Sequence, residues 1–168
     1  MEYKIEQPRL DFSRPLARRK PNEVKYLVIH HTDGPKIQPV EAIHEYHKSR
    51  GWNGVAYHFL VYEDGRIVKA RPILAYPACV KGLNRVCLCV AFVGSFMNRP
   101  PIKEHIDAGA YICAYLKKKW REYYKVTLEL KRHRDLADTY CPGEAFPWEQ
   151  FLRRVEEWLR TMEKPILG

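Results

Sequence analysis

The chain has 168 residues, of which 46% are hydrophobic and 12% aromatic, and its formal net charge at pH 7 is +9. This composition excludes a disordered chain, and no apolar run approaches the ~20 residues that a transmembrane segment needs. The positive charge favours polyanionic partners such as nucleic acid, anionic lipid or acidic polymers of a cell wall.

The chain divides into three predicted segments. Residues 1–23 carry prolines and mixed charge, which is typical of an extended arm packed on a domain. Residues 24–163 alternate between apolar strand and helix patterns, and residues 164–168 form a short C-terminal tail. The first residues contain no apolar segment of the signal-peptide kind, so we expect synthesis in the cytoplasm without a signal peptide. We also expect a monomer.

The first predicted element is a buried strand over residues 24–31. It is β-branched and apolar, and Thr32–Pro35 ends it with turn residues, a pattern typical of a central strand covered on both faces. Ligands of open α/β sheets lie beyond strand ends, so His30 and His31 are candidate site residues. Neighbouring strand residues point to opposite faces, and only one of the two histidines can therefore turn into a given site.

The remaining pattern alternates between helix and strand. It predicts a helix from residue 38 that stops at Gly51, a hairpin of strands 55–62 and 67–70, a strand over 86–93, a helix over 102–124, a strand over 126–130 and a helix over 146–162. The sequence thus predicts an α/β fold in a single domain, with a central mixed β-sheet of about five strands flanked by about three main helices. His44 and His47 share one face of the first helix, which we interpret as a polar surface helix.

Cysteine usage argues against a disulfide framework. Five cysteines are an odd number in a chain without a leader, and no Cys-x-x-Cys pair suggests a zinc ribbon or a redox motif. We interpret Cys87, Cys89 and Cys113 as small buried hydrophobic residues. Cys141 differs because it lies in a polar segment.

That segment, residues 131–143, is irregular and ends in Cys-Pro-Gly. His133 and Cys141 are eight residues apart and can meet across a loop, and His30 would complete a His₂Cys set. Three protein ligands with an open fourth position describe a catalytic zinc site. From spacing alone the alternative stays open, in which His133 is a surface residue and Cys141 belongs to the core.

Several strings occur in order along the chain: Val28–Thr32, Ala56–Leu60, Glu63–Arg66, His133–Asp135 and Thr139–Gly143. Together they resemble the zinc-dependent N-acetylmuramoyl-L-alanine amidases of the type 2 class, which include phage endolysins and the animal peptidoglycan recognition proteins. The likeness spans roughly residues 10–160 and also includes Asn84, Phe96 and the two prolines ahead of the long helix.

The resemblance implies one Zn²⁺ per chain, bound by His30, His133 and the thiolate of Cys141. Zinc in such a site polarises the amide carbonyl and lowers the pKa of its water towards ~7. The resemblance also implies two catalytic residues, Tyr57 and Thr139. Their hydroxyls would hydrogen-bond the developing oxyanion, a contribution of ~3–4 kcal/mol for a good donor.

Substrate contacts are expected from Asn84, Tyr76 and His31. His31 would turn away from the metal into packing or supporting contacts. Tyr76 stands in an Ala-Tyr-Pro string where many members of the family have Ala-His, which alters the expected contact. The strand segment Val90–Gly94 is wholly apolar, so the sequence identifies no carboxylate as general base.

The function implied by the resemblance is cleavage of the amide bond between N-acetylmuramic acid and L-alanine, with residues 24–163 as the catalytic domain. Such an endolysin or autolysin would act on the cell wall after lysis or holin-type release. Expected partners are peptidoglycan or muropeptides and anionic wall polymers. No specific nucleic-acid binding is expected, because the basic clusters lack interleaved aromatic residues. The alternative is a non-catalytic peptidoglycan-binding receptor of the same fold, although such receptors typically lack the cysteine ligand.

Overall fold

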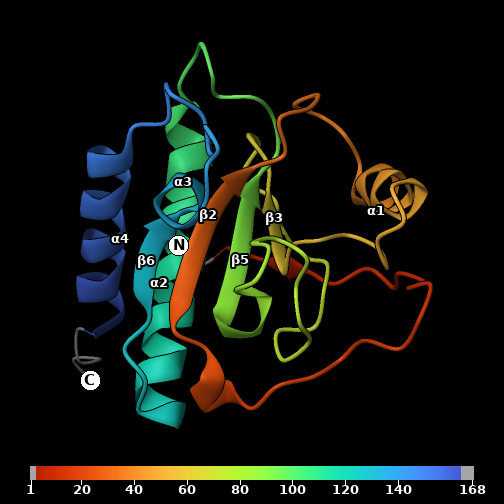
Figure 1. Cartoon of the computed structure of the whole chain (residues 1–168). Helices are drawn as coiled ribbons and strands as arrows, with labels where there is room; N and C mark the ends of the chain where they lie inside the picture. The colour runs from red at the N-terminus through yellow and green to blue at the C-terminus, as the bar shows by residue number, and fades with distance from the viewer. Residues whose placement is uncertain (1–2, 164–168) are drawn as a thin grey trace.

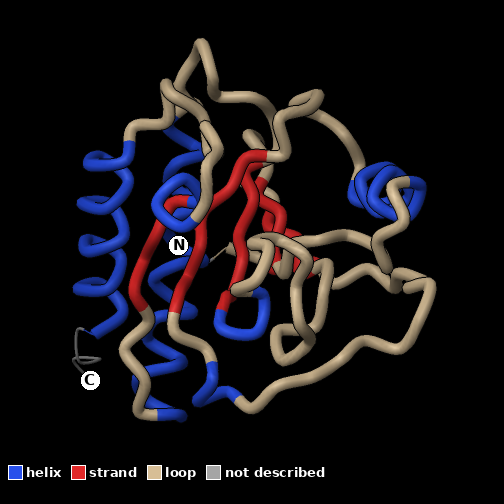
Figure 2. Tube along the Cα trace, viewed as in Figure 1, coloured by secondary structure: helices blue, strands red, loops and turns tan. Residues whose placement is uncertain are grey.

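The structure is a computed structural model that describes residues 3–163; the expected tail over 164–168 lies outside the described residues. Six strands form one sheet in the order β1-β4-β3-β5-β2-β6 (Figures 1 and 2). The strands are β1 (Ile5–Glu6), β2 (Tyr26–His31), β3 (Phe59–Val61), β4 (Ile67–Lys69), β5 (Cys87–Phe92) and β6 (Glu129–Arg132). The α-helices are α1 (Val40–Ser49), α2 (Lys103–Tyr124), α3 (His133–Leu136) and α4 (Trp148–Glu163). Two 3₁₀ turns cover Pro21–Glu23 and Asn84–Val86.

The sheet is mixed, and its centre is parallel. Strand β2 pairs in parallel with both β5 and β6, and β3 is parallel to β5 but antiparallel to β4. The carboxyl ends of β2, β3, β5 and β6 therefore meet at one edge of the sheet, at the top of Figure 1. The predicted single-domain α/β fold is confirmed. The sheet has six strands rather than about five, because Ile5–Glu6 adds a short parallel strand beside β4.

Helices and loops cover both faces of the sheet. Helices α2 and α4 lie together on one face, where Leu27 and Ile29 of β2 point into the largest apolar core. Val28 and the helix α1 belong to cores on the other face. Gly109 lets α2 approach the sheet closely, since a Cβ there would lie 2.2 Å from Cζ of Phe92. Among the described residues, no helix is long and apolar enough to cross a membrane.

Hydrogen bonds from two side chains, Arg19 and Trp120, fix the segment before β2 to the rest of the domain. Arg19 is 6% exposed, and its guanidinium donates hydrogen bonds to the carbonyls of Asn84, Arg85, Cys87 and Ile73. The indole of Trp120 in α2 donates to the carbonyl of Pro21 at 2.9 Å. These bonds satisfy backbone carbonyls that would otherwise be left unpaired when the loops pack together.

Two interpretations from the sequence are wrong. Cys79 and Cys89 form a disulfide, because the loop before β5 folds back over that strand; Cys87 and Cys113 are buried and free as expected. The pair is separated by ten residues, and the spacing alone does not show that the loop returns. His44 and His47 are 3% and 6% exposed, so this side of α1 faces the protein rather than solvent.

Candidate active site

Strand pairing brings the first two candidate ligands together. Ile29 of β2 and Arg132 of β6 are partners in a parallel pair, so the next residues, His30 and His133, leave neighbouring strand ends side by side. Their ring centroids are 4.6 Å apart. Helix α3 begins at His133 itself, so the predicted strand over 126–130 is displaced to Glu129–Arg132.

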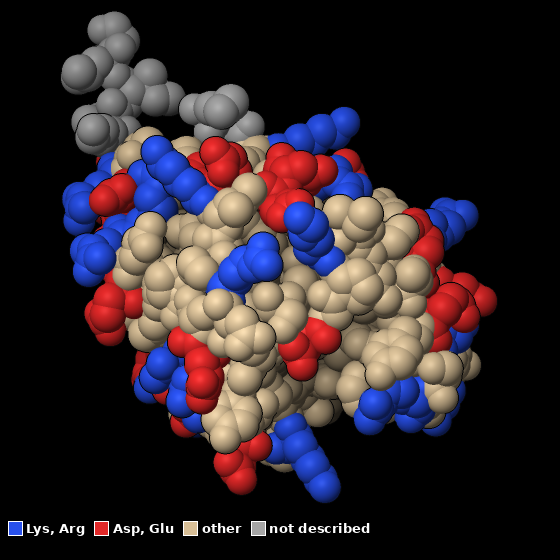
Figure 3. Space-filling model, turned by 90° about the horizontal axis from the view of Figure 1, so that it is seen from above, with Lys and Arg blue, Asp and Glu red and all other residues tan. Residues whose placement is uncertain are grey.

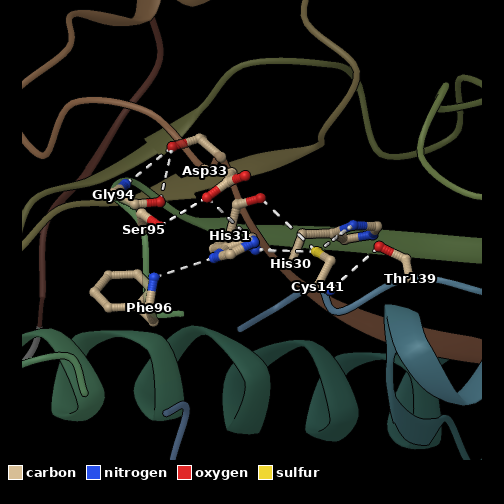
Figure 4. A network of polar contacts seen from close by, with 9 residues as sticks. His30, His31, Asp33, Gly94, Ser95, Phe96, Thr139 and Cys141 are labelled. Atoms are coloured by element: carbon tan, nitrogen blue, oxygen red, sulfur yellow. Dashed lines mark hydrogen bonds and ion pairs between the residues drawn. The ribbon is translucent and has the colours of Figure 1, made fainter. Parts of the chain in front are cut away.

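Cys141 completes this cluster from the loop after α3 (Figure 4). Its Sγ lies 3.6 Å from Nδ1 of His30, and the ligand atoms of His30, His133 and Cys141 all lie within 4.8 Å of one another. The backbone N–H of His31 donates to this sulfur at 3.3 Å. Thr139 accepts the backbone N–H of Cys141 at 3.2 Å, which fixes the turn that presents the cysteine.

The cluster fits a zinc ion by donor type and by spacing. A tetrahedral zinc holds its nitrogen and sulfur ligands about 3.6 Å apart, as follows from its bond lengths. Burial lowers the pKa of His30 well below its usual range and also lowers the pKa of His133, so both rings are neutral and have a lone pair to offer. Burial raises the pKa of the Cys141 thiol to about 12, so a bound cation is needed to hold it as a thiolate.

A second group of sulfurs lies behind His30. The ligand atoms of Cys79, Cys89 and His30 are also within 4.8 Å of one another, but the two sulfurs are joined in a disulfide and offer no thiolate. Nε2 of His30 is buried and has no hydrogen-bond partner among the described residues. The His30–His133–Cys141 group is therefore the better metal site.

His31 turns away from this cluster, as expected for a supporting residue. Its Nδ1 accepts the backbone N–H of Phe96 at 3.2 Å, and its Nε2 lies 3.9 Å from the carboxylate of Asp33 (Figure 4). The ring is 6% exposed, which argues against direct substrate contact. Its backbone N–H instead supports the sulfur of Cys141.

Tyr57 lies beside the cluster, with its ring centroid 5.1 Å from that of His30. Burial raises the pKa of its phenol, so at neutral pH the hydroxyl is a hydrogen-bond donor. Its segment is held by two histidines of α1 for which the sequence predicted no role in the site. His44 accepts the N–H of Val55 at 2.9 Å, and His47 accepts the N–H of Ala56 at 3.0 Å.

The ring of His47 also packs between two aromatic residues near the site. Its centroid lies 5.7 Å from that of Tyr57 and 4.8 Å from that of Trp52. Burial lowers its pKa to about 4, so the ring is neutral and keeps its acceptor. The three-residue spacing of His44 and His47 was visible in the sequence. It indicated one shared face but not that the face packs inward.

The other two expected substrate residues have different surroundings. The side-chain oxygen of Asn84 accepts the N–H groups of Cys79 and Val80, so it closes a loop and keeps only its amide nitrogen for a ligand. Tyr76 is half-buried and lines a pocket of about 380 Å³ together with Trp52. The substrate roles of Asn84 and Tyr76 remain predictions.

The edge of the sheet that carries the cluster is shown from above in Figure 3. Uncharged residues cover much of this face; lysines and arginines lie around its margins and also near its middle, where acidic residues lie close to them.

Fold and cluster together define an α/β domain with a His₂Cys site at the carboxyl edge of parallel strands. The chain belongs to the N-acetylmuramoyl-L-alanine amidase family, whose model matches residues 20–144. The resemblance inferred from the motifs is thereby confirmed.

Relatives in this family include enzymes and recognition proteins. The amidase LysC from Clostridium intestinale is 31% identical, with a TM-score of 0.80 over 92% of this chain and 99% of that chain. The Ph2119 endolysin of a Thermus scotoductus bacteriophage is 33% identical, with a TM-score of 0.71 over 90% and 99% of the two chains. Mouse peptidoglycan recognition protein 1 is 30% identical over 151 residues, which cover 80% of this chain and 75% of the relative.

Proposed function

We propose that the protein is a zinc-dependent N-acetylmuramoyl-L-alanine amidase that hydrolyses the bond between N-acetylmuramic acid and L-alanine in peptidoglycan. The observation that supports this most is the convergence of His30, His133 and Cys141 beside the protonated hydroxyl of Tyr57. The similarity to an amidase and an endolysin over nine-tenths of the chain points the same way.

The chain's residues have distinct roles in this proposal. His30, His133 and Cys141 would hold the ion, and bound zinc would supply Lewis-acid activation of the amide carbonyl and of water. Tyr57 donates a hydrogen bond to the carbonyl oxygen as charge develops there. The Thr139 oxygen is engaged with the Cys141 N–H, which leaves its hydroxyl proton to donate to the same substrate oxygen. Hydrolysis adds water across the C–N bond, and the departing amine takes up a proton.

Residues 24–163 would form the catalytic domain, with residues 1–23 as an arm packed on it. We propose peptidoglycan or a muropeptide as substrate and the cell wall as the place of action, reached after lysis or holin-type release. His31 would serve as a positioning residue, while Asn84 and Tyr76 would contact the substrate near its stem peptide.

The direct test is incubation of the purified protein with insoluble peptidoglycan, followed by counting of new alanine amino termini. We expect release that a chelator abolishes and added zinc restores. Cys141→Ser should lose release, whereas Cys113→Ser, at a buried cysteine in α2, should keep it. Release that persists in a demonstrably metal-free protein would refute the zinc assignment.

The role of Tyr57 is tested with Tyr57→Phe, which removes only the hydroxyl. We expect kcat on a soluble muropeptide to fall by ~10²–10³-fold, as when one oxyanion donor is removed, with KM little changed. Tyr26→Phe is the matched control, because Tyr26 begins β2 at the end opposite His30. Equal rates for the two variants would leave Tyr57 without a catalytic role.

The second candidate function is a receptor that binds peptidoglycan without cutting it, and similarity to a mammalian peptidoglycan recognition protein favours keeping it. It predicts that the protein sediments with insoluble peptidoglycan but releases no amino termini at any zinc concentration. Retention of the cysteine ligand favours the enzyme.

A further inference from the structure

A cationic pocket lies apart from the His30–His133–Cys141 cluster, where the segment around residues 7–12 crosses the end of β4. It has a volume of about 430 Å³. Three of the residues that line it are cationic, namely Arg9, Lys69 and Arg71, and none of them is acidic. We call it the arm pocket.

Arg71 is the unusual member of this group. It is 5% exposed, and its guanidinium donates to the carbonyl of Val55 at 2.8 Å and lies 5.4 Å from the centroid of the Phe12 ring. Its Nε has no partner among the described residues. Burial lowers its pKa to about 10, so it is still charged at neutral pH.

No carboxylate within the described residues lies in ion-pair range of this guanidinium; the twelve ion pairs found there involve other cations. Burying a charge without a partner is unfavourable, and natural proteins usually pair such groups. An anion from outside the chain would supply the missing partner.

The neighbouring cations strengthen the positive potential. Lys69 is partly buried, and its pKa is lowered by that burial and by the nearby charge of Lys119 on α2. Arg9 is exposed at the rim. Like charges gathered without intervening acids raise the local concentration of anions.

We propose that the arm pocket binds a phosphodiester group of a polyol-phosphate polymer. The guanidinium groups of Arg9 and Arg71 and the ammonium group of Lys69 suit phosphate oxygens. The volume exceeds what a lone phosphate fills and leaves room for the adjoining polyol. The binding step does not need amidase activity; only the assignment of the polymer to a bacterial wall rests on the proposed function.

Other phosphate-bearing partners fit the arm pocket less well. A nucleic-acid strand would need an exposed aromatic surface on which bases stack, but Phe12 is half-buried and lies against Arg71. A lipid surface would need exposed apolar side chains, and none of the large exposed hydrophobic residues in the described chain lines the pocket.

The test is titration of the full chain with a short synthetic poly(glycerol phosphate), read by calorimetry. Arg71 also holds the Val55 carbonyl, so the decisive variant is the double substitution Arg9→Gln and Lys69→Gln. The matched control is Arg153→Gln with Arg160→Gln, which removes the same charge from exposed positions of α4. We expect Kd to rise at least tenfold for the pocket variant and less than about twofold for the control. In the pocket variant, the slope of log affinity against log salt concentration should also be smaller by about two.

The proposal would be overturned by no binding by the unaltered chain, by equal weakening in both double variants, or by equally tight, pocket-dependent binding of a charge-matched oligodeoxynucleotide. Pocket-dependent binding to phosphatidylglycerol vesicles alone would instead indicate a lipid headgroup and overturn it too. Hydrolysis of a soluble muropeptide, measured in parallel, should be the same for all these variants. If neither the unaltered chain nor any variant hydrolysed the muropeptide, the proposed amidase activity would be refuted, and the binding result would still stand.

Discussion

The environment of His47 allows a quantitative prediction that separates positioning from simple packing. In His47→Ala the N–H of Ala56 loses its acceptor in a buried setting, which destabilises by ~1–3 kcal/mol. Removing a ring that is 6% exposed also leaves a cavity, at ~2–5 kcal/mol for comparable large-to-small changes. We expect a loss of about 3–5 kcal/mol in the free energy of unfolding, since the loop can partly collapse into the space.

The same substitution frees the backbone next to Tyr57. We expect kcat on a soluble muropeptide to fall at least tenfold, because a small misplacement of a catalytic donor is sufficient for a large rate loss. His47→Asn places an acceptor near the position of Nδ1 and should recover most of the rate and about half of the stability.

His44→Ala is the matched control. His44 accepts the N–H of Val55 and its other nitrogen bonds the carbonyl of Asp11, so the stability loss should equal or exceed that of His47→Ala. Its ring packs on Phe12, with a centroid distance of 5.0 Å, rather than on Tyr57. Urea unfolding and initial rates at a temperature where every variant is folded measure both quantities. Equal rate losses in the two alanine variants would refute the positioning role of His47.

Three further outcomes are expected. Cys141→Ser should lower the zinc found by mass spectrometry after dialysis from about one equivalent to near zero, and an unchanged content would contradict the ligand assignment. Burial lowers the pKa of His47 and His105 to about 4, against 6.5 in the unfolded chain. The unfolded state therefore binds more protons than the folded state between these two pH values. The contribution of each neutral ring to the free energy of unfolding should be fully present above pH 6.5 and fall by ~3 kcal/mol per group as the pH drops to 4. Urea midpoints across this range should fall less steeply in His105→Asn, and an equal slope would argue against its neutral burial. Gly109→Ala should destabilise by ~1–2 kcal/mol despite the better helix propensity of alanine, because the new methyl meets the Phe92 ring; a Tm at or above the original would show that the ring moves freely.

The local pattern of the sequence was sufficient for the main elements. The apolar run before His30, the long amphipathic stretch over 102–124 and the turn around Gly65 each specify one backbone conformation by short-range sterics and burial, and they appear as β2, α2 and the β3–β4 hairpin. Strand β6 starts three residues and ends two residues later than predicted, because pairing with β2, rather than local propensity, decides its bounds.

The candidate ligands could also be named in advance, but only through motifs in order along the chain. Spacing alone left open the alternative that His133 is a surface residue and Cys141 belongs to the core. Their convergence with His30 depends on β2 and β6 being parallel neighbours, a long-range property that no window of the sequence contains.

Tertiary structure alone decided the rest. Whether His47 faces solvent, whether Cys79 reaches Cys89 and whether Arg71 finds a carboxylate all depend on which segments pack against each residue. The sequence by itself determined the family, the main elements and the chemistry of the candidate ligands, because these follow from residue types and local order. The burial of side chains, their contact partners and the cationic arm pocket were decided by long-range packing, in which residues far apart along the chain replace water around one another.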